Sequence, residues 1–473
     1  MHVSDKKWSE DELMTELDRI KALHPTGQAI DLDEILAYHR QIPASRRVPE
    51  AHKRAAEAGE ALLQPRSGMA TVEEMIETLR HLETHGADLL TWTCDTYCRR
   101  NLFEKAAEAV AESQRVGRSL LNGFPAVVHG VAGCRQLFEA LEAPCEGRGA
   151  SGTPQAYNTF MLAGGATSFN GASLFCALSV EPHMPVAEVI GNFQYVDRLL
   201  GWFEERGASV SREAGGFPSG TITPPCVSIV ASIIECLLAA EQGLKSLCVA
   251  YPLNSCLNQD IAAVRMQHRL CADYLERAGF ADVHLTQAAH QWLGAYSDDL
   301  DQTFARICVD TVTCAFAGVS KILVKSPEEG RGAPTKEGNA SGIVATRKVL
   351  DLMRGQSFPE SEALTEEMEV IEQQCRAMMD RVLELGDGDV AQGTAIAFER
   401  GVLDFPFSVN RHNADKAMIA RDVEGAVRFI DSGNLPFTPR LRAYDRDRME
   451  ERRRREAKDD MELMIDDLRA VVR

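Results

Sequence analysis

An alternation of short apolar runs with amphipathic helical segments, from about residue 60 to about residue 340, most constrains how this chain folds. Apolar runs between turn residues predict strands, and strands that alternate with helices form parallel sheets. About eight such units fit a closed (β/α)8 barrel, an α/β TIM barrel, better than an open sheet. The expected strands cover residues 61–66, 87–93, 124–130, 163–168, a segment ending at 213, and residues 245–251, 282–288 and 319–324.

Two flanking regions follow a different pattern. Residues 1–59 contain helical segments and predict an N-terminal extension that covers one end of the barrel. Residues 341–473 are mainly helical, and we expect them to pack on the barrel of residues 60–340. Near the end of the chain, residues 445–472 predict one long charged helix.

The composition argues against nucleic acid and membrane as partners. The 473 residues carry a formal net charge of -19, whereas phosphate binding needs a basic surface. Four arginines at 452–455 are flanked by acids and indicate a solvated helix face. No apolar run reaches the roughly 20 residues of a membrane span, and the polar start shows no signal peptide. The 13 irregularly spaced cysteines indicate reduced thiols and a cytoplasmic protein.

Lys325 marks a candidate site, because it ends the apolar run of residues 317–324. Barrels place their chemistry at the carboxyl ends of strands. Three roles stay open for this lysine: a Schiff-base nucleophile, a phosphate or ribose ligand, or a structural cation paired with Glu329 one turn later. The sequence lacks the common nucleotide-binding, zinc-protease and serine-hydrolase motifs, and its histidines lack metal-ligand spacing.

Arginines also occur at predicted strand ends or in the loops that follow, namely Arg66, Arg99 or Arg100, and Arg148. A guanidinium presents a planar fork of donors that matches a carboxylate. Three of them at one barrel mouth would suit a small dicarboxylate. The alternative is that each is a surface arginine paired with a neighbouring acid.

Longer colinear segments give the chain a family resemblance. They are Gln64-Pro65-Arg66, His290-Gln291-Trp292, Val324-Lys325 and residues 117–125, 238–243, 334–337 and 433–438. Through them the chain resembles the large, or epsilon, subunit of glutamate mutase, also called methylaspartate mutase, over nearly its whole length. The resemblance implies a (β/α)8 barrel and an adenosylcobalamin-dependent radical rearrangement of L-glutamate to 3-methylaspartate. It also implies a separate small cobalamin-binding subunit, with two copies of this chain in a heterotetramer.

The resemblance assigns roles to individual residues. In the family an arginine trio holds the substrate carboxylates, and the matching positions are Arg66, Arg99 and Arg148. A lysine and a glutamate hold the adenosyl ribose, which makes Lys325 and Glu329 ribose ligands. The positions that match further cofactor-lining residues are Gly68, Asn122, Ser179, Tyr296 and Ala333.

The segment after Ser168 departs from the family. Asn170 stands where the family has an acid, and Cys176 and Val180 stand where it has two tyrosines. In the family the acid and the first tyrosine bind the substrate ammonium, and the second tyrosine also lines the substrate pocket. Losing a buried charged partner costs a cationic ligand roughly 2–5 kcal/mol by analogy with interfacial charge pairs. Two alternatives to glutamate mutase therefore stay open: the same rearrangement on another dicarboxylate or 2-oxo acid, and a non-catalytic assembly role beside a cobalamin protein.

Overall fold

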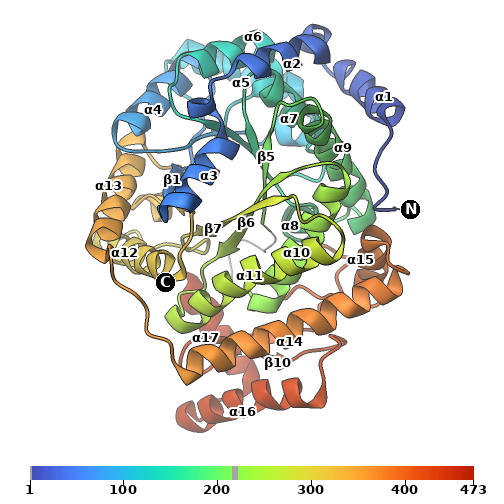
Figure 1. Ribbon diagram of the computed structural model, residues 1–473. Helices are drawn as coiled ribbons and strands as arrows, with labels where there is room; N and C mark the ends of the chain where they lie inside the picture. Colours follow the sequence, from blue (N-terminus) through green and yellow to red (C-terminus); the bar gives the residue numbers. More distant parts are fainter. Residues whose placement is uncertain (1–2, 216–221, 473) are drawn as a thin grey trace.

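The computed structural model describes residues 3–215 and 222–472 and contains one sheet of eight parallel strands. Neighbouring strands follow the order β1-β8-β7-β6-β5-β4-β3-β2. This arrangement confirms the predicted α/β barrel (Figure 1). The strands are β1 (Leu62–Pro65), β2 (Leu90–Thr93), β3 (Cys145–Arg148), β4 (Ser168–Asn170), β5 (Ser211–Ala214), β6 (Ser246–Pro252), β7 (His284–His290) and β8 (Lys321–Val324).

The two ends of this strand order, β1 and β2, nearly close the barrel. The Leu63 N–H donates to the Asp88 carboxylate at 2.8 Å, and the Asp88 N–H donates back to the Leu63 carbonyl at 3.0 Å. Further along, the Thr93 N–H donates to the Ser67 carbonyl at 3.1 Å. These bonds leave neither end strand with a free edge to pair with another chain.

Helices cover the outside of the barrel. Of these, α10 is buried along almost its whole length, because the barrel lies on one side of it and C-terminal helices lie on the other. The helices that follow β1 to β8 are α4 (Val72–Thr84), α5 (Phe103–Val116), α6 (Ala126–Glu139), α7 (Gln155–Ala163), α8 (Ser173–Val180), α9 (Val186–Glu204), α10 (Pro225–Glu241), α11 (Leu257–Arg277), α12 (Leu300–Ala317) and α13 (Lys336–Met353), with short 3-10 turns η3 (Cys98–Arg100) and η4 (Glu329–Arg331).

The N-terminal segment contributes α1 (Glu10–Lys21), α2 (Leu32–Gln41) and α3 (Val48–Ala58). Helix α3 lies against the amino-terminal ends of the strands. Its Val48 N–H donates to Thr167 Oγ1 at 3.0 Å, just before β4. His52 is completely buried 3.5 Å from Thr286 Oγ1, and burial lowers the pKa of His52 to about 3. The opposite, carboxyl end of the barrel is left for the functional site.

The C-terminal region packs along one side of the barrel, next to α10 and α11 (Figure 1). It contains α14 (Glu362–Leu385), α15 (Val390–Glu399), an antiparallel pair of strands β9 (Met418–Arg421) and β10 (Val427–Asp431), α16 (Pro439–Glu456) and α17 (Asp460–Val472). Buried Arg428 ties β10 to α14 through Glu367 at 2.6 Å.

The predicted strand over residues 124–130 is wrong. Helix α6 begins at Ala126, and Phe124 makes only one bridge to the end of β2. The third strand is β3, which alternates charged Glu146 and Arg148 with Cys145 and Gly147. A short valine-rich run fits a buried helix or a buried strand equally well. The charged residues of β3 hid it because they point into the barrel, where an apolar pattern is the usual expectation.

The single helix expected over residues 445–472 is also wrong. Helix α16 ends at Glu456, because Ala457 takes a left-handed conformation with φ of 53°, and α17 then starts at Asp460. Arg452 departs from the expected solvated face, since it is buried and pairs with Asp467 of α17 at 2.7 Å. This ion pair holds the two helices together.

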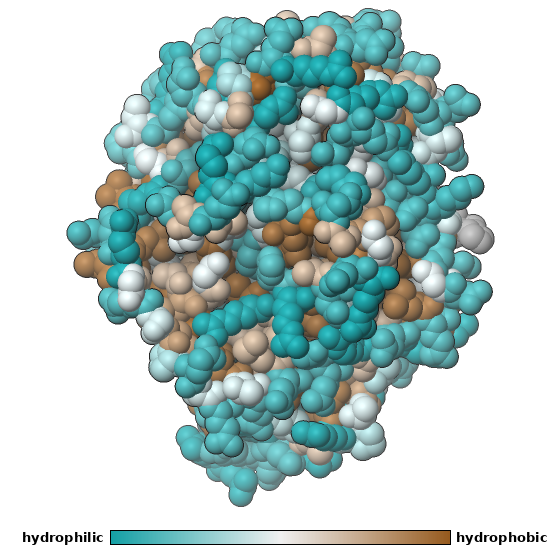
Figure 2. All heavy atoms as spheres, in the orientation of Figure 1, coloured by the Kyte–Doolittle hydropathy of each residue, from teal (hydrophilic) through white to brown (hydrophobic). Residues whose placement is uncertain are grey.

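The surface of the molecule is mostly hydrophilic on the face of Figure 2, with smaller apolar areas between the polar ones. Among the described helices, none is both long and apolar enough to cross a membrane. All 13 cysteines are free, and only Cys308 is not fully buried, which agrees with the predicted thiols.

Candidate active site

The carboxyl ends of neighbouring strands bring predicted substrate and cofactor residues to one end of the barrel. Arg66 directly follows β1 and Lys325 directly follows β8, and these two strands are paired in register to their last residues. Arg148 is the last residue of β3 and is paired with Asn170 of β4. The four side chains therefore lie at the mouth, where barrels place their chemistry.

Beneath the mouth, four charged side chains form a closed ring inside the barrel. Lys321 Nζ lies 3.0 Å from Glu146 Oε2 and 2.5 Å from Glu213 Oε2. Arg148 lies 2.6 Å from Glu146 Oε1 and 3.2 Å from Glu213 Oε1. The side chains are at most 6% exposed, so the two cations and two carboxylates neutralise one another out of water.

The ring fixes the protonation of its members. Burial by itself would raise the pKa of Glu213, but Arg148, Lys321 and His290 outweigh it and hold that pKa well below its usual value. Burial would lower the pKa of Lys321, and Glu146 and Glu213 raise it instead. Burial lowers the pKa of His290, whose Nε2 lies 2.9 Å from Glu213 Oε1. Glu213 is thus a carboxylate that neighbouring groups already surround.

Arg66 and Arg99 differ from Arg148, because the ion pairs of the described residues include neither of them. Solvent reaches Arg66 through the mouth. Desolvation by the surrounding protein lowers the pKa of Arg66, and the positive charges of Arg148 and Arg99 act in the same direction. The resulting pKa is about 10, so the guanidinium stays charged at neutral pH. Arg99 is half-buried and donates from Nε to the Cys94 carbonyl at 2.8 Å. Its neighbour Arg100 is exposed.

A second cluster lies around Lys325. Its Nζ is 3.2 Å from Glu329 Oε2 and 5.8 Å from the centre of the Tyr296 ring. Burial lowers the pKa of Lys325, and Glu329 opposes that shift. Gln291 accepts from the Lys325 N–H at 2.7 Å and fixes the start of the loop. A buried ammonium beside a partly exposed carboxylate offers one donor and one acceptor to a pair of adjacent hydroxyls.

The other predicted cofactor positions are more dispersed. Gly68 lies so close to the segment between α5 and α6 that a Cβ would stand 2.5 Å from Gly123 Cα. Asn122 is exposed and accepts from Thr96 Oγ1 at 3.0 Å. Ala333 is exposed in the loop after η4, and Ser179 is half-buried near the end of α8. Gly68 and Ala333 lie in the segments after β1 and β8, Asn122 lies between α5 and α6, and Ser179 lies in α8. No described hydrogen bond joins any two of them.

The three positions that depart from the family occupy different environments. Asn170 is at the mouth and donates from Nδ2 to Glu213 Oε1 at 2.6 Å. Cys176 is completely buried within α8, and Val180 is 37% exposed at the end of that helix. Asn170 is therefore the one of these three that is bonded directly to the interior ring.

Sequence reasoning missed Glu146, Glu213 and Lys321 as site residues. A signal was available, because Glu146 precedes Arg148 by two positions and side chains two apart on a strand share a face. Lys321 is likewise an even number of positions before Lys325. Among the described residues, no group of three or more histidine, cysteine, aspartate or glutamate side chains is placed to hold a metal.

Outside the barrel wall, the residue before Glu213 forms a different network. Arg212 lies 2.5 Å from Asp197 Oδ2 and 2.5 Å from Glu235 Oε2, and its Nε donates to the Gly171 carbonyl at 3.1 Å. Glu235 also accepts from Ser173 Oγ at 2.5 Å. Because Gly171 and Ser173 flank the start of α8, this network fixes the loop that follows Asn170.

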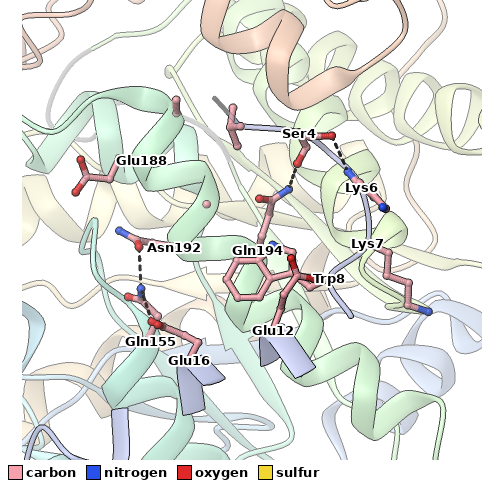
Figure 3. A pocket seen from close by; sticks show the side chains of 13 residues that line it. Ser4, Lys6, Lys7, Trp8, Glu12, Glu16, Gln155, Glu188, Asn192 and Gln194 are labelled. Atoms are coloured by element: carbon pink, nitrogen blue, oxygen red, sulfur yellow. Dashed lines mark hydrogen bonds between the residues drawn. The ribbon is translucent and has the colours of Figure 1, made fainter. Parts of the chain in front are cut away.

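A separate pocket of about 600 Å³ lies between the N-terminal segment, α1, α7 and α9 (Figure 3). Asn192 accepts from Gln155 Nε2 at 2.8 Å, and Gln194 donates to the Ser4 carbonyl at 2.6 Å. The residues that line this pocket include none of the predicted substrate or cofactor residues at the barrel mouth. It is a surface hollow formed where the N-terminal segment crosses α9.

Comparisons with known proteins identify the family of the chain. A sequence model of the family described as "Methylaspartate mutase E chain (MutE)" matches residues 42–473. The chain is 39% identical over 475 aligned positions to the glutamate mutase epsilon subunit of Treponema denticola, covering 100% of this chain and 98% of that protein. The epsilon subunit of Desulfitobacterium hafniense is 38% identical with the same coverage, and that of Haloarcula marismortui is 38% identical over 99% of this chain and 95% of its own. The chain therefore belongs to the methylaspartate mutase E chain family.

Proposed function

We propose that this chain is the large catalytic subunit of an adenosylcobalamin-dependent carbon-skeleton mutase of the glutamate mutase type, which rearranges the carbon skeleton of a small dicarboxylate. The family resemblance implies the interconversion of L-glutamate and 3-methylaspartate as the reference reaction. One observation carries the proposal. Arg66 and Arg99 stand at the mouth without an ion-pair partner among the described residues, above a ring that is already neutral. Two unmatched guanidiniums suit the two carboxylates of a small diacid.

In this proposal Arg66, Arg99 and Arg148 hold the substrate. Arg148 is itself held by Glu146 and Glu213, so its guanidinium keeps one orientation while the other two adapt. A fixed donor beside two solvent-accessible ones orients a diacid at little entropic cost. Closing the mouth over the diacid would exclude water and strengthen each of these contacts.

The residues present also fit the implied cofactor. Lys325 can donate to one ribose hydroxyl and Glu329 can accept from the other, and the Tyr296 ring lies beside them. When bound, adenosylcobalamin supplies the radical that removes a substrate hydrogen atom and starts the rearrangement. The chain itself carries no D-x-H-x-x-G motif for cobalt. We therefore assign the cobalt ligand to a small cobalamin-binding subunit, with two copies of each chain in a heterotetramer.

The test is reconstitution of the full chain with a small subunit of the family and adenosylcobalamin. We expect a radical signal in electron paramagnetic resonance that depends on an added diacid, with L-glutamate, the substrate named for the relatives, in the panel. Arg66→Gln should abolish the signal, whereas Arg100→Gln, a matched change at an exposed neighbour, should keep it. Absence of a signal with every diacid would overturn the proposal and favour an assembly role.

A further inference from the structure

The charges around the mouth are unequal. Five cationic side chains meet three carboxylates there, and every one of these carboxylates already contacts a cation. Glu146 and Glu213 belong to the interior ring, and Glu329 is paired with Lys325. Arg66 and Arg99 remain unmatched among the described ion pairs. The sequence of residues 216–221, which lie outside the description, contains no aspartate or glutamate.

Glu213 is the carboxylate closest to position 170, and it has no oxygen left for a substrate cation. Its Oε1 accepts from Asn170 Nδ2 at 2.6 Å and lies 2.9 Å from His290 Nε2. The same oxygen is 3.2 Å from Arg148, and Oε2 is 2.5 Å from Lys321. A carboxylate oxygen accepts about two hydrogen bonds, so these contacts saturate Glu213.

Asp95 does not offer a replacement. It follows β2 and is completely buried. Its Oδ1 accepts from the N–H groups of Tyr97 at 2.8 Å and Cys98 at 3.1 Å. Its other oxygen, Oδ2, is buried without a hydrogen-bond partner among the described residues, out of contact with solvent. Asp95 therefore serves to shape its own loop.

The opposite wall of the barrel interior is apolar. Residues paired in register point to the same face, so Cys248 faces inward with Glu213, and Ala288 faces inward with Lys321. Ala250 is paired with Ala288 and completes a surface of small side chains on β6 and β7. Phe175 of α8 packs against these three residues. The interior thus has a cationic side at β8 and β1–β3, and a surface of small side chains on β6 and β7 next to His290 at the end of β7.

We propose that the substrate of this site is a small diacid with two carboxylates and no ammonium group, such as a simple or 2-oxo dicarboxylate. This inference rests on the proposed function and narrows its substrate class. The unmatched arginines bind the carboxylates, and the carbon chain lies against the small side chains of β6 and β7. An ammonium at position 170 would find only the uncharged amide oxygen of Asn170 in place of a carboxylate, because Asn170 Nδ2 donates to Glu213. It would also meet a surplus of positive charge.

Binding measurements on the reconstituted complex test this inference separately from turnover. Glutarate, 2-oxoglutarate and L-glutamate are matched in their two carboxylates, and calorimetry gives the dissociation constant of each. We expect both amine-free diacids to bind at least tenfold more tightly than glutamate at pH 7. Glutamate binding as tight as glutarate, or no binding of any diacid, would overturn the inference. The proposed function fails on a different result, namely diacid binding with no radical signal.

A pH series adds a second readout. If glutamate enters as the neutral amine, its affinity rises as pH increases from 7 to 9, because a larger fraction is unprotonated. The affinity of glutarate stays constant, because its carboxylates are ionised throughout. Equal pH dependence for the two ligands contradicts the proposal.

The matched variant is Asn170→Asp, which places a carboxylate at the mouth with little change in shape. We expect it to narrow the preference for glutarate over glutamate at least fivefold. Asn258→Asp, at the start of α11, is the control and should leave the ratio unchanged, because its side chain is bonded to the Ala363 carbonyl of the C-terminal region. Circular dichroism confirms folding, and the wild-type ligand panel decides the question if Asn170→Asp does not fold. An unchanged ratio in a folded Asn170→Asp protein counts against the proposal.

Discussion

Residues 212 and 213 lie side by side on β5 and yet belong to two opposite kinds of charge network. Arg212 points out of the barrel, where one guanidinium meets two carboxylates, Asp197 and Glu235. Glu213 points inward, into a balanced ring with unmatched arginines above it. Both networks are buried, so burial alone does not separate a structural network from a functional one.

The two networks differ in which kind of charged group is in excess. The outward network has an excess carboxyl, and burial raises the pKa of Asp197 to about 7 with Arg212 opposing the shift. A retained proton can therefore satisfy it without a ligand. The inward site has excess guanidiniums, which cannot lose their protons near neutral pH. An anion from outside can neutralise them, so we propose that the inward site is the one that binds a substrate.

The largest expected effect is on stability and follows removal of Arg212. Arg212→Leu leaves Asp197 and Glu235 buried without their cation, which costs about 3–5 kcal/mol of unfolding free energy. Urea unfolding of the full chain measures it. Arg115→Leu removes an exposed pair with Glu112 and is the matched control, with no measurable change expected. A loss no greater than that of the control would show that the outward network is not structural.

Arg99 should behave in the opposite way. In the reconstituted enzyme we expect Arg99→Gln to lower kcat/KM roughly 30- to 1,000-fold, equivalent to about 2–4 kcal/mol of lost charged contact with the substrate. Unfolding free energy should change by less than about 1 kcal/mol, because Arg99 has no buried carboxylate partner to strand. Arg100→Gln changes the exposed neighbour and should retain activity. An equal loss of kcat/KM in the two variants would show that Arg99 has no role that its surface neighbour Arg100 lacks.

The sequence predicted the site residues at the barrel mouth better than those of the buried ring beneath it. Arg66 and Lys325 follow apolar strands directly, so their position at the mouth could be inferred from the strand pattern. Glu146 and Glu213 sit within strands, where an inward charge breaks the apolar pattern that identifies a strand. Apart from Arg148, which shares β3 with Glu146, their partners lie on other strands, and pairing across a barrel depends on register, which local sequence does not encode. The same problem concealed β3 and led to the wrong strand at residues 124–130.

The retained proton of the outward network gives a pH test. In the unfolded chain an aspartate has a pKa of about 3.9, whereas the pKa of Asp197 in the folded chain is about 7. Between these values the unfolded state releases a proton that the folded state keeps, so stability falls as pH rises and levels off above pH 7. Asparagine does not titrate, so Asp197→Asn is the reference. Relative to it, the unfolding free energy of the wild type should fall by about 1.4 kcal/mol from pH 5 to pH 6. Parallel pH profiles of urea unfolding would contradict a retained proton at Asp197.

The smallest effect is expected at Glu329, on the cofactor side of the mouth. Its side chain is 22% exposed beside buried Lys325, so solvent screens part of their attraction, unlike that within the interior ring. Glu329→Gln keeps an acceptor for a ribose hydroxyl and loses only the charge. We expect adenosylcobalamin to bind the reconstituted complex two- to fivefold more weakly, or about 0.4–1 kcal/mol, in an absorbance titration.

Glu337→Gln, an exposed change in the first turn of α13, controls for the lost charge alone. Diacid binding should be the same in both variants, because Arg66 and Arg99 do not pair with Glu329. If Glu329→Gln weakened diacid binding and left cofactor affinity unchanged, Lys325 and Glu329 would bind the substrate together with Arg66 and Arg99. The mouth would then hold a single site for the substrate, in place of adjoining substrate and cofactor sites.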